Sequence, residues 1–307
     1  MDIDVIIPLY KPGKELFTLL DILERQTVPI RRIILMNTEK PYFDRLIAGT
    51  DFNNRYQNVR VYHLTKQEFD HGGTRREGVC RSEAPVFLMM TQDAMPKDTR
   101  LVEKLTANLK GDVAVAYARQ LAGRESSVLE RFSRRFNYPT KTCIKSAEDL
   151  PRLGIKTYFC SNVCAAYRRD IYDSLGGFVD RAIFNEDMIY AASAIRAGYR
   201  IAYEAEAGVI HAHNYTCMQQ FHRNFDLGVS QAEHPEVFGS IRSESEGMRM
   251  VKSATAFLRS HRMAEKIPYF YLQCFFKYAG YLLGKHYRKL PRRFVLACTA
   301  SPDYWTK

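Results

Sequence analysis

The chain has 307 residues, 46% of them hydrophobic, and a formal net charge of +11 from 45 basic and 34 acidic residues. This length and composition suit one large core or two smaller ones, and they exclude a disordered or repetitive chain. The positive charge favours an anionic partner, and the absence of any nucleic-acid-binding motif leaves a nucleotide or an acidic membrane surface.

The amino-terminal half alternates between strand and helix patterns. The apolar run at residues 3–7, before Pro8, predicts a strand buried on both faces. Leucines at helical spacing predict a helix over residues 16–23. The alternation predicts an α/β domain on a mostly parallel sheet. Further strands are expected at 33–36, 59–64, 86–90 and 113–117, and further helices at 74–82 and 101–109.

Polar side chains follow several of these predicted strands. Tyr10, Asn37, Gln92, Asp93 and, later, His211 all stand where a strand ends. Ligands of parallel α/β sheets bind at the carboxyl ends of the strands, so these residues are expected to converge. Neither a G-x-G-x-x-G nor a P-loop motif is present, which argues against ordinary dinucleotide binding and P-loop phosphate hydrolysis.

Two adjacent carboxylates, Glu186 and Asp187, open an apolar helical pattern, and a histidine pair at 211 and 213 follows a strand pattern. A carboxylate at a helix start can stay ionised and accept a proton, and a histidine can hold a metal. Adjacent helical residues point about 100° apart, so both carboxylates cannot face one substrate. We favour Asp187 as a catalytic base and Glu186 as a residue that orients the acceptor; the alternative is a charge pair that only stabilises the helix start.

The composition changes near residue 215. We therefore expect a catalytic domain over residues 1–215 and a helical region over 216–307. Residues 266–293 interleave Tyr and Phe with Lys and Arg, which suits a helix at a membrane interface. The alternative is that this helix packs its apolar face on the catalytic domain. The amino terminus lacks a signal-peptide pattern and the seven cysteines show no C-x-x-C spacing, so we expect a cytoplasmic protein.

Six segments, in this order, resemble glycosyltransferase family 2, which has the GT-A fold, and within it the bacterial rhamnosyltransferase-like members. The resemblance covers about residues 2–230, and the ordered set is specific although each piece alone is weak. The segments are Val5–Tyr10, Glu68–Arg75, Thr91–Ala94, Gly176–Phe178, Asn185–Asp187 and His211–Tyr215.

The resemblance implies a metal-dependent, inverting transfer of a sugar from a nucleotide diphosphate sugar to an acceptor hydroxyl. Asp93 matches the family's D-x-D motif, which helps to hold Mn²⁺ or Mg²⁺, but Thr91 replaces its first aspartate. His211 would then be the second protein ligand; the alternative is that the histidines are structural. Arg223 lies in a segment similar to the Q-x-x-R-W element of processive members, and Asn224 in place of Trp argues against a processive polymerase.

The other residues that the resemblance assigns would bind the donor. The backbone of the loop before residue 75 would suit a diphosphate at a helix start. The expected donor-binding set is Pro8, Tyr10, Asn37, Glu39, Asp70, Gly72, Gly73, Arg75, Gln92, Asp93 and Arg223.

The function that the resemblance implies is transfer of L-rhamnose from dTDP-L-rhamnose to a cell-surface polysaccharide or its lipid-linked precursor. A UDP-sugar donor is the main alternative. A protein that binds a nucleotide sugar without turning it over is a different class of function, which the replacement at Thr91 favours. The expected place of action is the cytoplasm, including the inner face of the plasma membrane.

Overall fold

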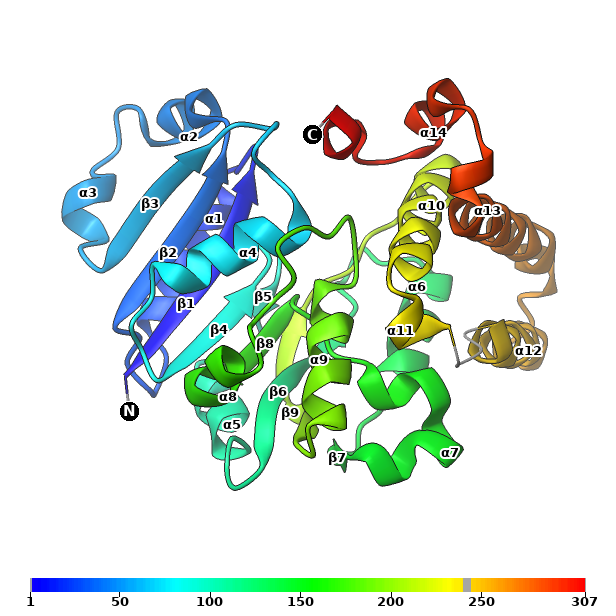
Figure 1. The fold of residues 1–307 in the computed structure, drawn as a ribbon, viewed down its shortest axis with the longest axis horizontal. Coiled ribbons are helices and arrows are strands. Elements are labelled where there is room, and N and C mark those ends of the chain that lie inside the picture. Colours follow the sequence, from blue (N-terminus) through cyan, green and yellow to red (C-terminus); the bar gives the residue numbers. More distant parts are fainter. Residues whose placement is uncertain (1, 240–243, 307) are drawn as a thin grey trace.

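A nine-stranded sheet runs through the molecule, with helices on both faces and a further group of helices beside it (Figure 1). The computed structural model describes residues 2–239 and 244–306. The strand order is β3-β2-β1-β4-β8-β6-β9-β5, and β7 pairs with β9. This mixed α/β architecture with a carboxyl-terminal helical region confirms the predicted fold class.

The first four main strands are parallel, as the alternating pattern predicted. They are β1 (Ile3–Tyr10), β2 (Arg32–Thr38), β3 (Val59–Leu64) and β4 (Val86–Met90). Both faces are covered, which explains why β1 is a continuous apolar run. The connecting helices are α1 (Glu15–Glu24), α2 (Lys40–Ile47), α3 (Phe52–Arg55) and α4 (His71–Cys80).

The second half of the sheet is mixed. Strand β8 (Cys164–Arg168) lies antiparallel between β4 and β6 (Val113–Leu121), while β9 (Arg200–Ile210) is parallel to β6. Short strands β5 (Met95–Pro96) and β7 (Cys143–Lys145) run antiparallel to β9. Because β8 is antiparallel, residues 161–163 before it lie beside the end of β4, where the Thr91 amide donates to the Val163 carbonyl at 3.1 Å.

Helices of this half are α5 (Leu101–Ala107), α6 (Val128–Asn137), α7 (Leu150–Leu153), α8 (Arg169–Ser174) and α9 (Glu186–Arg196). Helix α9 begins at the carboxylate pair. Before it, Asn185 has a left-handed backbone, with φ of 63°, and its side-chain amide nitrogen donates to Ser230 Oγ at 3.1 Å. A left-handed non-glycine residue is strained, and this contact offsets the strain where the chain turns into α9.

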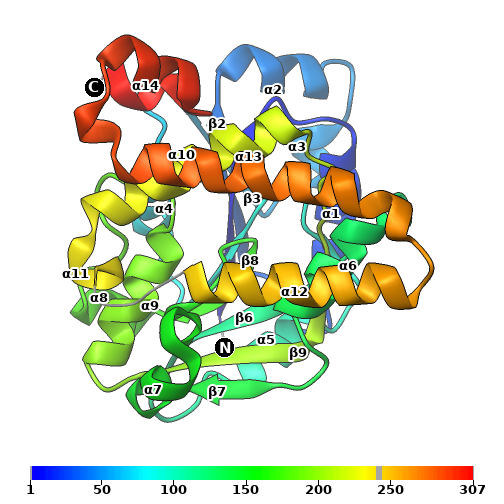
Figure 2. The same cartoon turned by 90° about the vertical axis from the view of Figure 1, so that its right-hand side faces the viewer.

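The carboxyl-terminal helices are α10 (Cys217–Glu233), α11 (Pro235–Phe238), α12 (Glu244–Ser260), α13 (Ile267–Lys285) and α14 (Arg292–Cys298). Figure 2 shows α13 lying across α10. The two helices touch backbone to backbone: a Cβ on Gly284 would lie 2.0 Å from the Phe225 carbonyl oxygen, and one on Gly280 would lie 2.2 Å from that of Phe221. Glycine is therefore required at this crossing.

Helix α10 begins two residues after the composition change at residue 215, and it also packs on the catalytic half. Phe225 and Val229 share an apolar cluster with Ile183, just before α9. The division into domains at 215 stays a prediction. In the part of the chain that the structure describes, no helix has the length and apolar character needed to cross a membrane.

Candidate active site

A cavity of about 700 Å³ lies where β1, β4 and β9 end, beside the start of α9. Most of the predicted site residues line it, although they come from distant parts of the sequence. They are Pro8, Tyr10, Arg75, Gln92, Asp93, Glu186, Asp187, His211 and Arg223. The convergence predicted for residues at strand ends is found for Tyr10, Gln92, Asp93 and His211, whereas Asn37 does not line this cavity.

Three side chains form a candidate metal centre in this cavity. His211 Nε2 lies 3.5 Å from Asp93 Oδ1, and His213 Nε2 lies 3.1 Å from Asp93 Oδ2. The two Nε2 atoms are 3.0 Å apart, and one ligand atom from each residue lies within 4.8 Å of the others. Two imidazoles and a carboxylate are a donor set for a divalent metal. His213 was not predicted as a ligand; the H-x-H spacing after a strand is the signal that could have identified it.

Contacts behind the cluster fix the orientation of His211. Its Nδ1 lies 3.1 Å from Gln120 Oε1, which also accepts from Arg134, while the Gln120 amide nitrogen donates to Ser161 Oγ. An amide oxygen only accepts, so His211 Nδ1 carries the proton and Nε2 keeps its lone pair towards Asp93. Gln120 therefore fixes the ring orientation and the tautomer of His211.

The cluster also governs the charge of Asp93. Burial opposes ionisation of Asp93, but the two neighbouring histidines outweigh it, so the pKa of this carboxyl is lowered. Burial lowers the pKa of His211, which Asp93 only partly offsets. An ionised Asp93 beside an uncharged His211 is the charge state that a divalent metal requires of such ligands.

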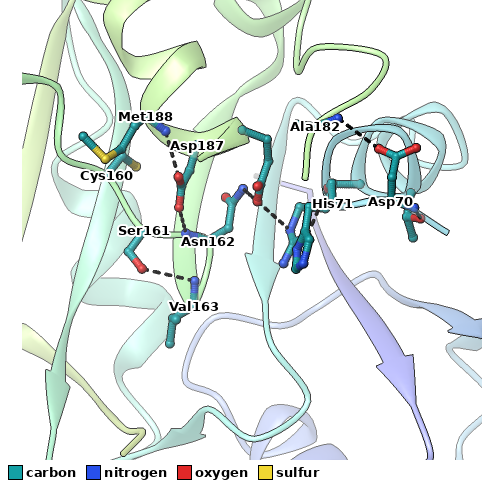
Figure 3. A network of polar contacts seen from close by, with 12 residues as sticks. Asp70, His71, Cys160, Ser161, Asn162, Val163, Ala182, Asp187 and Met188 are labelled. Atoms are coloured by element: carbon teal, nitrogen blue, oxygen red, sulfur yellow. Dashed lines mark hydrogen bonds and ion pairs between the residues drawn. The ribbon is translucent and has the colours of Figure 1, made fainter. Parts of the chain in front are cut away.

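The two carboxylates at the start of α9 have different surroundings, as Figure 3 shows for Asp187. Asp187 is partly exposed to the cavity and accepts backbone hydrogen bonds from Asn162 at 2.9 Å and from Met188 at 2.8 Å. Glu186 is 4% exposed, lies 3.2 Å from Arg75 Nε and accepts from the Asn162 side chain at 3.0 Å. Asp187 thus faces the ligand space, and Glu186 is held by protein.

Burial, followed by the negative charge of Glu186, raises the pKa of Asp187 to about 7. The two backbone N–H bonds oppose this rise without cancelling it. A carboxyl group that titrates near neutral pH is a stronger base than an ordinary aspartate and is still ionised in part. The predicted preference for Asp187 over Glu186 as base agrees with this geometry and stays a prediction.

Asn162 is a site residue that the sequence reasoning missed. Its backbone binds Asp187, its side-chain nitrogen binds Glu186, and its side-chain oxygen accepts from the Tyr167 hydroxyl at 2.7 Å. It therefore sets the positions of both carboxylates. It lies in an unremarkable loop before β8, and no spacing in the sequence marks it.

The loop before α4, which was predicted to bind the donor, makes several contacts with protein. Asp70 caps α4 by accepting from the Gly73 amide at 2.7 Å, and the His71 amide donates to the Ala182 carbonyl at 3.0 Å. Cβ atoms on Gly72 and Gly73 would lie 2.5 Å from the Val179 oxygen and 2.7 Å from the Asp180 oxygen. These glycines allow the 179–182 loop to approach, and two of the amides expected to bind diphosphate already have protein partners.

Two more residues of the predicted donor set lie outside the large cavity. Asn37 is fully buried and its amide nitrogen lies 3.0 Å from His63 Nδ1. Glu39 precedes α2 with φ of 67°, and its Oε1 accepts from the Lys66 amide at 2.8 Å. A nucleobase contact by either residue therefore stays a prediction.

The remaining predicted residues keep their side chains at the cavity. Gln92 holds the end of β1 by a pair of bonds to the Tyr10 backbone, of 2.9 Å to its nitrogen and 3.0 Å to its oxygen. The Arg223 guanidinium lies 5.3 Å from the ring centre of Phe184 and 5.0 Å from that of Tyr215. Among the described residues Arg223 has no carboxylate partner, which leaves its charge available to an anion.

The fold is of the GT-A type, as the solved structures described below share it. A family model, Glycosyl transferase family 2, matches residues 4–176, so the chain belongs to glycosyltransferase family 2. The predicted family is thereby confirmed.

Two curated relatives resemble the chain over nearly its whole length. The O-antigen chain rhamnosyltransferase RfbN of Salmonella typhimurium is 37% identical over 311 residues, which cover 99% of this chain and 96% of that protein. The O-antigen chain rhamnosyltransferase WbaN of Salmonella anatum is 38% identical over 307 residues, covering 98% and 95%.

Solved structures share the fold at low sequence identity. The mannosyltransferase PcManGT from Pyrobaculum calidifontis, in complex with GDP-Man and Mn²⁺, has a TM-score of 0.63 at 12% identity, covering 94% of this chain and 88% of that one. TarS 1–349 of S. aureus has a TM-score of 0.51 at 15% identity, covering 94% and 92%.

Proposed function

We propose that this glycosyltransferase moves L-rhamnose from dTDP-L-rhamnose to an acceptor hydroxyl of a cell-surface polysaccharide or its lipid-linked precursor, with inversion at the anomeric carbon. The observation that carries the proposal is the position of Asp187, whose carboxylate lines the same cavity as the Asp93 cluster. Burial raises the pKa of this carboxylate, which suits a base. The rhamnosyltransferase names of the two relatives support the choice of sugar.

In the proposed reaction Asp187 takes the proton of the acceptor hydroxyl while the hydroxyl oxygen attacks the anomeric carbon. The bond from that carbon to the diphosphate oxygen breaks, and the nucleoside diphosphate leaves with the bonding electrons. Attack opposite the leaving group inverts the anomeric centre. Arg223 binds the diphosphate, and Glu186, held by Arg75 and Asn162, keeps the start of α9 in register with the acceptor.

Asp93, His211 and His213 would hold a divalent ion, which would balance the charge on the leaving diphosphate. Mn²⁺ is the proposed ion, because Mg²⁺ prefers oxygen ligands and two of these three are imidazoles. His213 compensates for the missing first carboxylate of the D-x-D motif at Thr91. This favours an enzyme over the alternative of a non-catalytic nucleotide-sugar-binding protein.

The proposed place of action is the anionic inner face of the plasma membrane. On α13 one face exposes Tyr271, Leu272, Phe275, Tyr278 and Leu282, with Phe275 65% exposed. The single charged residue within 267–284, Lys277, instead lines the cavities between α13 and α6. Aromatic and aliphatic side chains between basic ends suit the interface of an anionic bilayer.

The test is product release from a panel of nucleotide sugars, after EDTA treatment and with Mn²⁺ or Mg²⁺ restored. Metal-dependent release of dTDP from dTDP-L-rhamnose is expected. Turnover of a UDP-sugar instead would assign the alternative donor. Nucleotide-sugar binding without turnover, in the presence of a glycan acceptor extract that supports RfbN, would assign the non-catalytic alternative and refute the proposal.

A further inference from the structure

A second cavity, of about 380 Å³, lies between the carboxyl ends of β1 and β2 and the last residues of the chain. Tyr10 and Thr38 line one side of it, and residues 300–304 line the other. Figure 1 places the carboxyl terminus beside this edge of the sheet. The chain thus returns, after five helices, to the end of its own first strand.

The two cavities adjoin each other. Tyr10, Phe69 and His71 line both the 380 Å³ cavity and the catalytic cavity. One ligand can therefore occupy the smaller cavity with one end and reach Asp93 and Asp187 with the other. A nucleoside diphosphate sugar has this form, with a flat base at one end and the reacting carbon at the other.

The lining of the smaller cavity has groups that suit a nucleoside. Tyr10 is 38% exposed and offers an aromatic ring. Thr38 is 3% exposed, and its hydroxyl oxygen has no hydrogen-bond partner among the described residues. A buried hydroxyl without a partner costs free energy, which a ligand with a polar edge would recover.

The far wall is held firmly in place. The Thr299 hydroxyl donates to Asp226 Oδ1 at 2.6 Å, and the Ala300 amide donates to Asp226 Oδ2 at 3.1 Å. Tyr304 is 6% exposed, donates to Glu233 at 3.1 Å and carries the Arg181 guanidinium 4.3 Å from its ring centre. Because Asp226 and Glu233 belong to α10, the helical region positions this wall.

The two walls of this cavity carry opposite charges. Lys66 lines the cavity on the β3 side, and Asp303 lines it on the carboxyl-terminal side. The Tyr10 hydroxyl, and more weakly Asp303, raise the pKa of Lys66, so its ammonium group stays charged. A cation at the rim attracts the phosphates of an entering nucleotide.

We propose that residues 300–304 form the second wall of the nucleoside pocket, so that the carboxyl-terminal segment is part of the donor site. The base lies between this segment and Tyr10, with the Thr38 hydroxyl at its polar edge, and the diphosphate passes His71 towards Asp93. The inference rests on the proposed function, because it takes the donor to be a nucleoside diphosphate sugar.

The probe is dTDP, titrated into the full-length protein and followed by calorimetry and by tryptophan fluorescence. Trp305 is the only tryptophan of the chain, and its ring centre lies 5.7 Å from that of Tyr304. Binding in the pocket is expected to change its emission. Ser301→Phe, which fills the cavity, is expected to weaken dTDP binding at least about tenfold, and Thr38→Val about three- to tenfold, as for the loss of one hydrogen bond.

The matched control is Thr306→Phe, which adds the same ring to the same segment at an exposed position that does not line the cavity. It is expected to bind dTDP like the wild type. Suppose that Ser301→Phe and Thr38→Val show normal circular dichroism and unchanged dTDP affinity, and that the wild-type protein turns over its donor. This result would overturn the proposed nucleoside pocket and leave the proposed function standing. Failure of the wild type to bind dTDP, UDP or GDP would overturn the proposed function itself.

Discussion

The Asp187→Asn variant is expected to lose turnover and, at alkaline pH, to gain stability. General base catalysis contributes about 10²- to 10⁴-fold to a rate, so kcat should fall by about that factor. The affinity for dTDP should change little, because the carboxylate acts on the acceptor proton and not on the nucleotide. In the wild type, kcat should rise with pH and level off above the Asp187 pKa of about 7.

The stability effect follows from the sign of the pKa shift. Folding raises the pKa of Asp187 from 3.8 to about 7, so the native state holds this proton more tightly than the unfolded state does. Asp187 therefore costs stability as the pH rises from about 4 to about 7, by up to about 4 kcal/mol at about 1.4 kcal/mol per pH unit. Below pH 4 the group is protonated in both states and the cost vanishes.

Asparagine stays neutral at every pH but has one acceptor oxygen for the two backbone N–H groups of Asn162 and Met188. The lost bond costs about 1–3 kcal/mol. We therefore expect a net gain in the free energy of unfolding of about 1–3 kcal/mol at pH 8 and a loss at pH 4. Denaturant titrations at the two pH values measure both, with Asp173→Asn, which is 58% exposed, as control.

Near-normal turnover in Asp187→Asn would refute the assignment of the base. A free energy of unfolding that changes equally at pH 4 and pH 8 would refute the raised pKa and its burial origin.

Three further predictions concern other parts of the molecule. Removing one imidazole with His213→Ala should weaken Mn²⁺ affinity at least about tenfold by calorimetry, and unchanged affinity would exclude it as a ligand. Gly284→Ala should lower the free energy of unfolding by about 1–3 kcal/mol, because the new Cβ would lie 2.0 Å from the Phe225 carbonyl oxygen. The control Gly247→Ala has open space around it and should leave the free energy of unfolding unchanged. Equal effects of the two substitutions would contradict the close packing of α10 on α13. Phe275→Glu should reduce co-sedimentation of the protein with vesicles that contain anionic lipid. The control Met248→Glu, at a 57% exposed position on α12, should not reduce it. Vesicle binding that survives in Phe275→Glu would place the membrane contact elsewhere.

The amino-acid sequence alone predicted the α/β class, and nine of its fourteen candidate site residues line the cavity. Continuous apolar runs such as residues 3–7 predict strands buried on both faces, and the carboxyl ends of parallel strands must share an edge. That is why Tyr10 and Asp93 could be placed together from the sequence. The local pattern at Glu186 and Asp187 likewise located the start of α9.

Other features were decided by contacts between segments that no local spacing encodes. The loop glycines at 72 and 73 were predicted to bind phosphate, but the distant 179–182 loop packs against them and accepts the His71 amide, while Asp70 accepts the Gly73 amide. Asn162 reaches both carboxylates only because β8 inserts antiparallel beside β4. The pKa of Asp187 is a property of burial in the assembled fold.

The carboxyl-terminal region shows most clearly which features a sequence pattern predicts and which depend on contacts between distant segments. Its composition predicted a basic, aromatic helix that either meets a membrane or packs on the enzyme, and it left these as alternatives. In the tertiary structure the glycine face of α13 packs on α10, within the helical region itself, while the opposite face stays exposed. The membrane contact stays a prediction. It also returns residues 300–304 to β1, because buried Asp226 on α10 needs the hydrogen bonds that Thr299 and Ala300 supply.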